Sequence, residues 1–291
     1  MILVTGASGQ LGRLVIKALL RSIAPSEVVA GVRSPEKVSD LAQAGVQIRT
    51  VDYDRAEALD AALSGVEKVL LISGNAVGRR VPQHGAVISA ARKAGVRLLA
   101  YTSVLRAPTS ALGVAPEHRE TEALIKSSGL PCVLLRNGWY CENYLARAAG
   151  AVATGTLVGC AGEGRICAAA RADYADGAAA VLTAPDQAGR VYELAGDEAF
   201  TLSSFTALLT RQLGKTISYK NLSEPEFKAA LESNGVPAAY SGLIARSDAA
   251  TSEGALFDQG HQLSGLIGRA TTPIEAMIAE ALRDGRLKRP T

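Results

Sequence analysis

Aromatic residues, histidines and cysteines are scarce in this sequence, and each scarcity narrows what the protein can be. Aromatic residues make up 4% of the 291 residues, whereas apolar residues make up 48%. That balance is typical of parallel strands covered by small-residue helices and does not favour an aromatic-rich binding surface. The few histidines and cysteines are His84, His118, His261, Cys132, Cys141, Cys160 and Cys167. Their spacing matches no metal site, so we expect no metal and free thiols in a reducing compartment.

The chain also lacks a long apolar run and a strong excess of either charge. No run approaches the ~20 apolar residues that a membrane-spanning helix needs. Residues 1–5 already fit a first strand and leave no room for a leader peptide, so we expect a cytoplasmic protein without a membrane segment. The net charge of +3 fits an anionic ligand but not the clustered charge of nucleic-acid-binding proteins.

Apolar runs alternate with helical periodicity along the first half of the chain. The expected strands are 1–5, 28–32, 46–51, 69–72, 96–102 and 132–135, and the expected helices are 11–20, 35–44, 56–63, 81–94 and 117–127. Strict alternation of this kind demands a parallel sheet with right-handed crossovers. The sequence therefore predicts an α/β fold with a Rossmann-type doubly wound parallel sheet.

The alternation weakens beyond residue 131, where glycine, alanine and polar residues interrupt the pattern. A late strand at 191–195 is expected to return to the main sheet, and 202–213 and 225–233 have helical patterns. We therefore expect a dinucleotide-binding domain over 1–131 and a smaller α/β substrate-binding lobe over 132–291, interleaved with it.

A glycine-rich loop joins the first expected strand to the first expected helix. It reads Gly6-Ala7-Ser8-Gly9-Gln10-Leu11-Gly12. In that context one glycine permits a tight turn, the next lets backbone N–H groups approach a pyrophosphate, and the last allows close helix packing. The helix N-terminus adds its positive dipole end. Because no G-x-x-x-x-G-K-[ST] motif is present, the loop predicts a dinucleotide site and not a P-loop.

The end of the second expected strand carries a base where NAD-specific sites carry an acid. Arg33 stands at this position, and Lys37 follows one helical turn later. A guanidinium there can clamp a 2′-phosphate bidentately. The pattern predicts NADPH as the cofactor.

Three further segments fit either a binding role or a local structural role. A carboxylate at Asp52, beside Tyr53, can meet the adenine amino group or cap the following turn. Ser73-Gly74-Asn75 follows the fourth expected strand and can form a wall of the cofactor groove or an ordinary turn of small residues. Arg171 can contact a phosphate or substrate, or form a surface salt bridge.

Several sequence blocks together resemble one family. Gly6–Gly12, Asp52-Tyr53, Ala100-Tyr-Thr-Ser103 and Leu135-Arg-Asn-Gly-Trp-Tyr140 resemble the atypical short-chain dehydrogenase/reductase group of NmrA-like proteins. Within it, the likeness points to the NADPH-dependent type 2 quinone oxidoreductases and triphenylmethane reductase. It continues through residues 142–145, 171–174, 191–196 and 256–258.

The resemblance implies a two-lobed enzyme that passes hydride from NADPH to a quinone. No second nucleotide motif is visible, so no flavin is expected. The resemblance further implies that the nicotinamide end of the cofactor is lined by Asn137, Gly138, Trp139, Tyr140, Cys141 and Glu142. Reductases of this kind are often dimers, although the sequence carries no interface signature.

The chain departs from ordinary short-chain dehydrogenases in its acid and base groups. No tyrosine has a lysine four positions later, and the segment after Ser103 offers His118 and Glu122 instead. Alcohol oxidation is therefore disfavoured. A quinone is an easier acceptor, because hydride addition yields a stabilised anion without strong acid catalysis.

Asn137 and Tyr140 are the catalytic candidates, since an amide or a phenol can bind a quinone oxygen as negative charge develops. The alternative is structural: Asn137 would shape a turn, and Tyr140 would fill the interface between the lobes. Histidine ordinarily titrates near neutrality, which makes His118 a candidate proton donor, but we favour helix histidines without chemistry for both His118 and His84.

Two alternatives belong to other functional classes. A non-catalytic NmrA-like redox sensor would bind NADP(H) and a partner protein without turnover. A reductase of another electrophile, such as a triphenylmethane dye, would consume NADPH with a different acceptor.

Overall fold

The computed structural model describes residues 1–287, which divide into two compact units. Unit 1 comprises residues 1–107, 116–137 and 171–192, and unit 2 comprises 108–115, 138–170 and the chain from 193 onward. Unit 1 therefore extends past residue 131, where the sequence suggested a boundary, to residue 137, and it takes in one later segment, 171–192.

A seven-stranded sheet forms the centre of unit 1, in the order β3-β2-β1-β4-β5-β6-β8. Its strands are β1 (Ile2–Val4), β2 (Val28–Val32), β3 (Gln47–Thr50), β4 (Lys68–Leu71), β5 (Leu98–Val104), β6 (Cys132–Asn137) and β8 (Val191–Leu194). Strand β1 pairs in parallel with β2 and β4, and the pairs β2–β3, β4–β5 and β5–β6 are parallel as well. This order confirms the Rossmann-type sheet, and the late strand at 191–194 lies at its edge.

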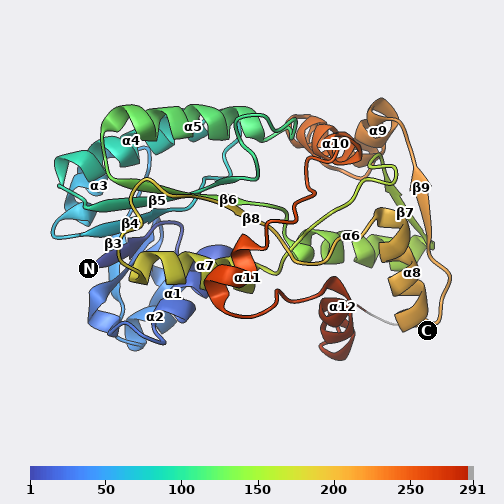
Figure 1. The fold of residues 1–291 in the computed structure, drawn as a ribbon, viewed down its shortest axis with the longest axis horizontal. Helices are drawn as coiled ribbons and strands as arrows, with labels where there is room; N and C mark the ends of the chain where they lie inside the picture. Colours follow the sequence, from blue (N-terminus) through green and yellow to red (C-terminus); the bar gives the residue numbers. More distant parts are fainter. Residues whose placement is uncertain (288–291) are drawn as a thin grey trace. The chain divides into compact units, whose positions relative to one another are not determined.

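Helices cover both faces of this sheet. They are α1 (Gln10–Leu19), α2 (Ser39–Gln43), α3 (Ala56–Leu63), α4 (Arg80–Lys93), α5 (Ala115–Ser128) and α7 (Arg171–Thr183), with 3₁₀ turns at Pro25–Glu27 and Pro35–Val38. Helices α3, α4 and α5 lie on one face, and α1, α2 and α7 lie on the other (Figure 1). The inner strands β1, β2, β4 and β5 are mostly apolar because both faces of the sheet are covered, and Leu3, Val69 and Leu99 are almost completely buried.

Two helical segments of unit 1 differ from the sequence prediction. The single helix expected over 35–44 is a 3₁₀ turn followed by the short helix α2, because Val38 leaves helical geometry (φ −133°, ψ 31°) and buries its side chain completely. Helix α7 was not predicted. Most of its residues are buried, so it lacks the polar stripe that marks an amphipathic helix.

Unit 2 contains a parallel two-stranded sheet, β7–β9, and six helices within the described residues. Its elements are α6 (Cys141–Thr154), β7 (Thr156–Gly159), α8 (Leu202–Leu213), β9 (Ser218–Asn221), α9 (Glu224–Ser233), α10 (Ala238–Ser252), α11 (Gln262–Ile267) and α12 (Ile274–Arg283). Helices α8 and α9 each begin with a capping box, formed by Thr201 with Ser204 and by Ser223 with Glu226. These signals explain why both helices were predictable from sequence.

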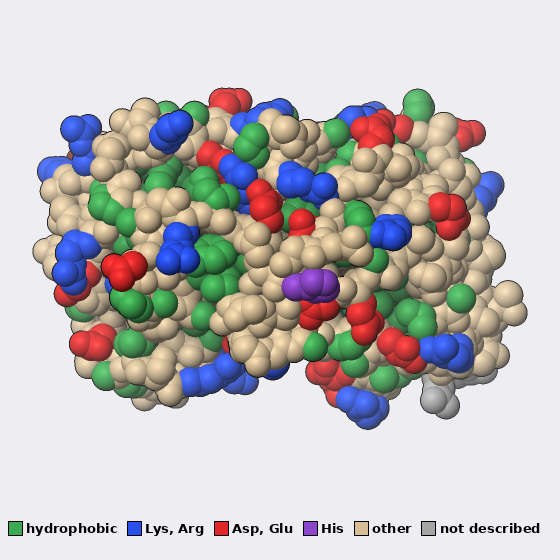
Figure 2. Space-filling model, viewed as in Figure 1, with side chains coloured by type: hydrophobic (Ala, Val, Ile, Leu, Met, Phe, Trp, Pro, Cys, Tyr) green, Lys and Arg blue, Asp and Glu red, His purple; other side chains and the backbone are tan. Residues whose placement is uncertain are grey.

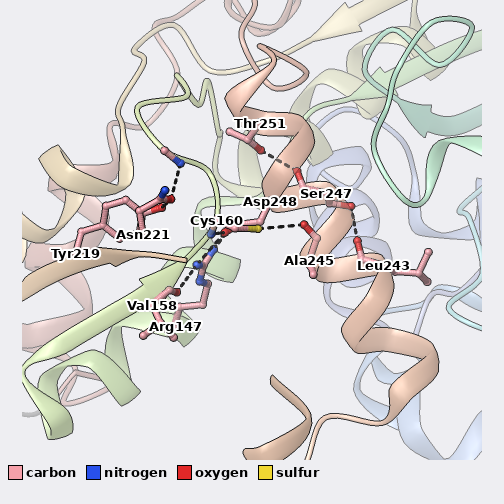
Figure 3. A network of polar contacts seen from close by, with 11 residues as sticks. Arg147, Val158, Cys160, Tyr219, Asn221, Leu243, Ala245, Ser247, Asp248 and Thr251 are labelled. Carbon is pink, nitrogen blue, oxygen red and sulfur yellow. Dashed lines mark hydrogen bonds and ion pairs between the residues drawn. The ribbon is translucent and has the colours of Figure 1, made fainter. Parts of the chain in front are cut away.

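An ion pair between the partly buried Arg147 and the buried Asp248 joins α6 to α10 inside unit 2 (Figure 3). Arg147 Nη1 lies 2.9 Å from Asp248 Oδ1, and the other guanidinium nitrogen donates to Val158 O at 2.9 Å. Asp248 Oδ2 accepts the backbone N–H of Cys160 at 2.8 Å. The pair thus fastens both helices to the end of β7. Burial raises the pKa of the Cys160 thiol to about 12, so this thiol stays protonated.

The surface charges are mixed. On the face shown in Figure 2, Lys and Arg side chains are interspersed with Asp and Glu. None of the helices within residues 1–287 is long and apolar enough to cross a membrane. In the same part of the chain, no three His, Cys, Asp or Glu side chains gather as a metal site would require.

Candidate functional site

The candidate site begins where two neighbouring strands of the unit 1 sheet end. Strand β1 pairs with β2 on one side and β4 on the other, so the order of connections reverses between β1 and β4. Open α/β sheets bind ligands at such a switch point, beyond the carboxyl ends of the strands. Thr5 follows β1 and Ile72 follows β4, and the Ile72 N–H donates to Thr5 Oγ1 at 2.9 Å. The two loops that leave this point are the glycine loop and residues 73–75.

The glycine loop has backbone geometry that other residues would not tolerate. Gly6 has a positive φ of 59°, which L-residues rarely adopt. The Gly9 N–H then turns back to Gly6 O at 2.9 Å, and the Ala7 N–H donates to Gly31 O at 3.1 Å. A Cβ at Gly12 would lie 2.8 Å from Ala7 Cα, so α1 packs against the loop only because this position has no side chain. Gly6, Ser8, Gly9 and Gln10 are exposed, whereas Ala7 and Leu11 are buried.

Helix α1 presents an open N-terminus to this loop. Its N-cap is Gly9, and within the described chain no side chain caps it. The first turn carries no acidic residue. Its unpaired N–H groups and the positive dipole end therefore suit an anion. The loop and the helix start fit the pyrophosphate of a dinucleotide.

Arg33 follows β2 and is exposed, as is Lys37 in the next turn. Arg13, in the first turn of α1, donates to the carbonyl of Lys37 and forms an ion pair with Asp40 at 2.7 Å. This contact ties the segment that carries the two bases to the start of α1. Nothing in the sequence around Arg13 shows which loop its side chain reaches.

Asp52 and Tyr53 have different local roles. Asp52 Oδ1 accepts the Asp54 N–H at 3.1 Å, as expected of a carboxylate that caps a turn. The Tyr53 hydroxyl lies 2.6 Å from Thr5 Oγ1 and 3.2 Å from Ile72 O. Burial raises the pKa of Tyr53 to about 12, so the hydroxyl keeps its proton and stays available as a donor at this junction.

The loop Ser73-Gly74-Asn75 is held by hydrogen bonds to its backbone. The Ser73 N–H donates to Thr102 Oγ1 at 2.9 Å, and the Gly74 N–H donates to His84 Nε2 at 2.9 Å. Arg80 Nε donates to the Gly74 carbonyl at 2.6 Å. His84 and Arg80 were not among the expected site residues, because a histidine and an arginine in a helix give no local sign of a loop partner.

The acid and base groups near the ends of β5 and β6 are already engaged. Ser103 donates to Glu122 Oε1 at 2.5 Å, and Arg136 forms a bidentate pair with the same carboxylate at 3.0 and 2.7 Å. The Tyr101 hydroxyl lies 2.7 Å from His118 Nδ1, and burial lowers the pKa of His118 to about 3. A neutral, buried imidazole is a poor proton donor at neutral pH, which agrees with the interpretation of His118 as a histidine without chemistry.

Asn137 is the last residue of β6 and is only 5% exposed. Among the described residues its Oδ1 has no hydrogen-bond partner. A buried acceptor left unpaired costs about 1–3 kcal/mol, so it points to a donor on a bound molecule.

The remaining expected residues lie at the starts of two helices. In unit 2, Gly138 donates its N–H to Leu194 O at 2.7 Å. Tyr140 is the N-cap of α6 and forms a bridge with Ala169, whose N–H donates to Trp139 O at 3.1 Å. Cys141 and Glu142 form the first turn of α6, and Arg171 begins α7 in unit 1. The structure thus brings the glycine loop, Arg33, residues 73–75 and Asn137 to the carboxyl edge of one sheet, while residues 138–142 belong to unit 2.

Comparison with known proteins agrees with this arrangement. A family model described as NAD(P)H-binding matches residues 6–185. The chain is 50% identical to quinone oxidoreductase 2 of Escherichia coli, over 96% of this chain and 98% of that protein. The crystal structure of that NADPH-dependent enzyme with NADPH superposes with a TM-score of 0.94, covering 96% of this chain and 99% of the other.

Two other relatives widen the comparison. The Citrobacter triphenylmethane reductase, solved with NADP(H), is 35% identical with a TM-score of 0.92, covering 97% of this chain and 100% of that one. An NmrA-like family domain-containing oxidoreductase of Aspergillus flavus is 28% identical over 98% of this chain and 95% of that protein. The chain therefore belongs to the NAD(P)H-binding family, in the NmrA-like group that its sequence blocks resemble.

Proposed function

We propose that the protein is an oxidoreductase that carries hydride from NADPH to a quinone without flavin. The observation that carries the proposal is the open N-terminus of α1 behind the glycine loop, with Arg33 and Lys37 exposed beyond the neighbouring strand. The quinone is proposed because the Escherichia coli relative, 50% identical over nearly the whole chain, is a quinone oxidoreductase.

The choice of NADPH over NADH rests on charge at the end of β2. Arg33 stands where a carboxylate would hold the ribose hydroxyls of NAD. The nearby carboxylate Asp40 is paired with Arg13. A 2′-phosphate would therefore meet the two exposed bases Arg33 and Lys37.

NADPH supplies the hydride when it is bound, and the chain orients the reactants. The Gly6–Gly12 loop and the start of α1 would hold the pyrophosphate, and residues 73–75 would border the groove beside it. Asn137 Oδ1, buried and unpaired within the described chain, would accept an N–H or O–H from a bound molecule. In our proposal Asn137 is a polar group of unit 1 that would bind the quinone. The family resemblance makes Tyr140, the other residues of 138–142 and Arg171 further candidates for contact with the cofactor or the quinone.

Strong acid catalysis is not needed for this reaction. Glu122 is paired with Arg136, and His118 is hydrogen-bonded to Tyr101. A quinone that gains hydride becomes a hydroquinone anion with delocalised charge, and it takes its proton from water. Positioning and electrostatics supply the rate.

The test is NADPH oxidation by purified protein with a panel of simple quinones, followed by absorbance at the reduced-nicotinamide band. We expect loss that requires both protein and quinone and that is faster with NADPH than with NADH. NADPH that binds in a fluorescence titration but is not consumed with quinones, dyes or activated alkenes would overturn the proposal in favour of an NmrA-like sensor. If NADPH is consumed with a triphenylmethane dye but with no quinone, the dye would replace the quinone as the proposed acceptor.

We further propose a cytoplasmic location and a homodimer. All four cysteines are free, as expected in a reducing compartment. Fractionation of cells would test the location. Light scattering of the purified protein would test the assembly, and a measured mass equal to that of one chain would contradict the dimer.

A further inference from the structure

We propose that His84 is a positioning residue, which fixes the Ser73-Gly74-Asn75 loop in the conformation that binds NADPH. The proposal rests on the proposed function, because it assigns that loop to the cofactor groove. His84 lies in α4 and is fully buried. It acts through the Gly74 peptide and does not itself contact the cofactor.

Hydrogen bonds on both ring nitrogens determine the tautomer of His84. A backbone N–H can only donate, so Nε2, which lies 2.9 Å from the Gly74 nitrogen, must be unprotonated. The proton therefore resides on Nδ1 and is donated to Thr121 Oγ1 at 3.0 Å. Thr121 in turn donates its hydroxyl to the carbonyl of Glu117 at 2.8 Å. Each group in this series of hydrogen bonds donates to the next, from Gly74 through His84 and Thr121 to Glu117, so the position of each proton is fixed.

The surroundings keep the His84 imidazole neutral. The rings of Tyr53 and Tyr101 lie edge-on to it, with centroids 6.3 and 5.5 Å away. Burial, with a smaller contribution from the charge of Arg80, lowers the pKa of His84 to about 4. At neutral pH Nε2 therefore remains an acceptor for the Gly74 N–H.

Arg80 secures the other polar group of the same residue. Its Nε donates to the Gly74 carbonyl at 2.6 Å, and its Nη1 lies 3.4 Å from Glu117 Oε2. Glu117 also accepts the Gly78 N–H at 3.0 Å, so α4 and α5 hold the whole turn. With both its N–H and its carbonyl bound, Gly74 cannot rotate its flanking peptides independently.

The anchored loop occupies a functional place in the sheet. It follows β4, next to the strand that leads into the glycine loop. The anchors His84 and Thr121 are completely buried, whereas Gly74 is half-buried and Asn75 is exposed. The loop is therefore rigid on its protein side and open on the other, which is the arrangement that a preformed binding wall requires.

The experiment compares His84→Leu, His84→Gln and a matched control, His118→Leu. His118 is also a buried, neutral histidine of unit 1, but it bonds to Tyr101 and not to the loop. We expect His84→Leu to raise the Kd for NADPH about 10-fold by fluorescence titration, equivalent to about 1.4 kcal/mol. KM for NADPH should rise in parallel while kcat at saturation changes little. His84→Gln keeps an acceptor and a donor and should bind within about 3-fold of wild type.

Two results would overturn the proposal. One is wild-type NADPH affinity in His84→Leu. The other is an equal loss of affinity in His118→Leu, because the effect would then follow from general destabilisation. If His84→Leu does not fold, the near-isosteric Thr121→Val removes the acceptor of Nδ1–H and should raise the Kd about 3-fold, with an unchanged Kd contradicting us. Binding is measured without turnover, so a wild-type protein that binds NADPH but reduces no quinone would refute the proposed function alone.

Discussion

A Cβ atom on Gly12 would lie 2.5 Å from the carbonyl oxygen of Gly6, well inside any van der Waals contact. These two glycines therefore depend on each other. Gly6 turns the chain through a positive φ, and its carbonyl then occupies the space where a side chain at position 12 would stand. Their separation of six positions is therefore a steric requirement for packing α1 against the end of β1, and it does not depend on any ligand.

Gly12→Ala should destabilise the protein and weaken NADPH binding. The added methyl meets backbone atoms that cannot move aside without shifting the loop, at a cost of about 1–3 kcal/mol. Denaturant unfolding and NADPH titration measure the two effects. Gly150→Ala is the matched control, since a Cβ there meets nothing within 4 Å in helix α6 and should leave both unchanged or slightly raise stability. Equal stability of the two variants would contradict the packing argument.

Arg33→Asp should lower the affinity for NADPH more than about 10-fold and spare NADH, because it removes a charged contact with the 2′-phosphate worth about 1.4 kcal/mol. Parallel titrations with the two nucleotides provide the check. Arg92→Asp, at an exposed position in the last turn of α4, changes the net charge by the same amount and should alter neither affinity. Equal losses for NADPH and NADH in Arg33→Asp would remove the 2′-phosphate assignment.

Stability should fall as pH is lowered from about 6.5 towards 4.5. Burial depresses the pKa of His84 to about 4 and that of His118 to about 3, so the unfolded chain binds more protons than the folded chain in this window. The free energy of unfolding should therefore fall by on the order of 3 kcal/mol between pH 6.5 and pH 4.5. Urea denaturation at several pH values measures the slope. His118→Leu should flatten it by about half, and an unchanged slope would mean that buried histidines do not cause it.

Asp248→Asn should destabilise unit 2 because it leaves the partly buried guanidinium of Arg147 without its counter-ion. Asp248 is 7% exposed, and breaking such a pair costs about 3–5 kcal/mol. Glu232→Gln, which breaks the more exposed ion pair with Lys228, should cost less than about 0.5 kcal/mol. Denaturant midpoints of the two variants give the comparison, and similar losses would show that burial does not matter here.

Several features of unit 1 were predictable because they depend on residues close together in the chain. The glycine loop, the alternation of strands and helices and the base at Arg33 all appear as local patterns. Helix α12 has an apolar stripe and was nevertheless not predicted. Helices α7 and α10, which were not predicted either, lack such patterns: α7 is buried around most of its circumference, and α10 combines alanines and serines with no clear stripe. Their positions follow from packing against other elements.

The site residues also divide into those with a local sequence pattern and those without one. Asp52 illustrates it, since sequence left an adenine contact and a turn cap open, and a single hydrogen bond to Asp54 identifies the cap. Arg80 and His84 carry no local motif, yet both bind the backbone of Gly74 and so hold the loop at residues 73–75.

The sheet class and the glycine loop after the first strand could be inferred from the sequence alone, because backbone conformation and periodicity are properties of neighbouring residues. The base at Arg33 predicts a phosphate at the end of β2. Only the tertiary structure decided that His84 is a neutral acceptor, that Glu122 is paired with Arg136, and that Asn137 keeps an unpaired oxygen within the described chain. Protonation and hydrogen-bond satisfaction depend on burial and on partners tens of residues away, which the order of amino acids does not display.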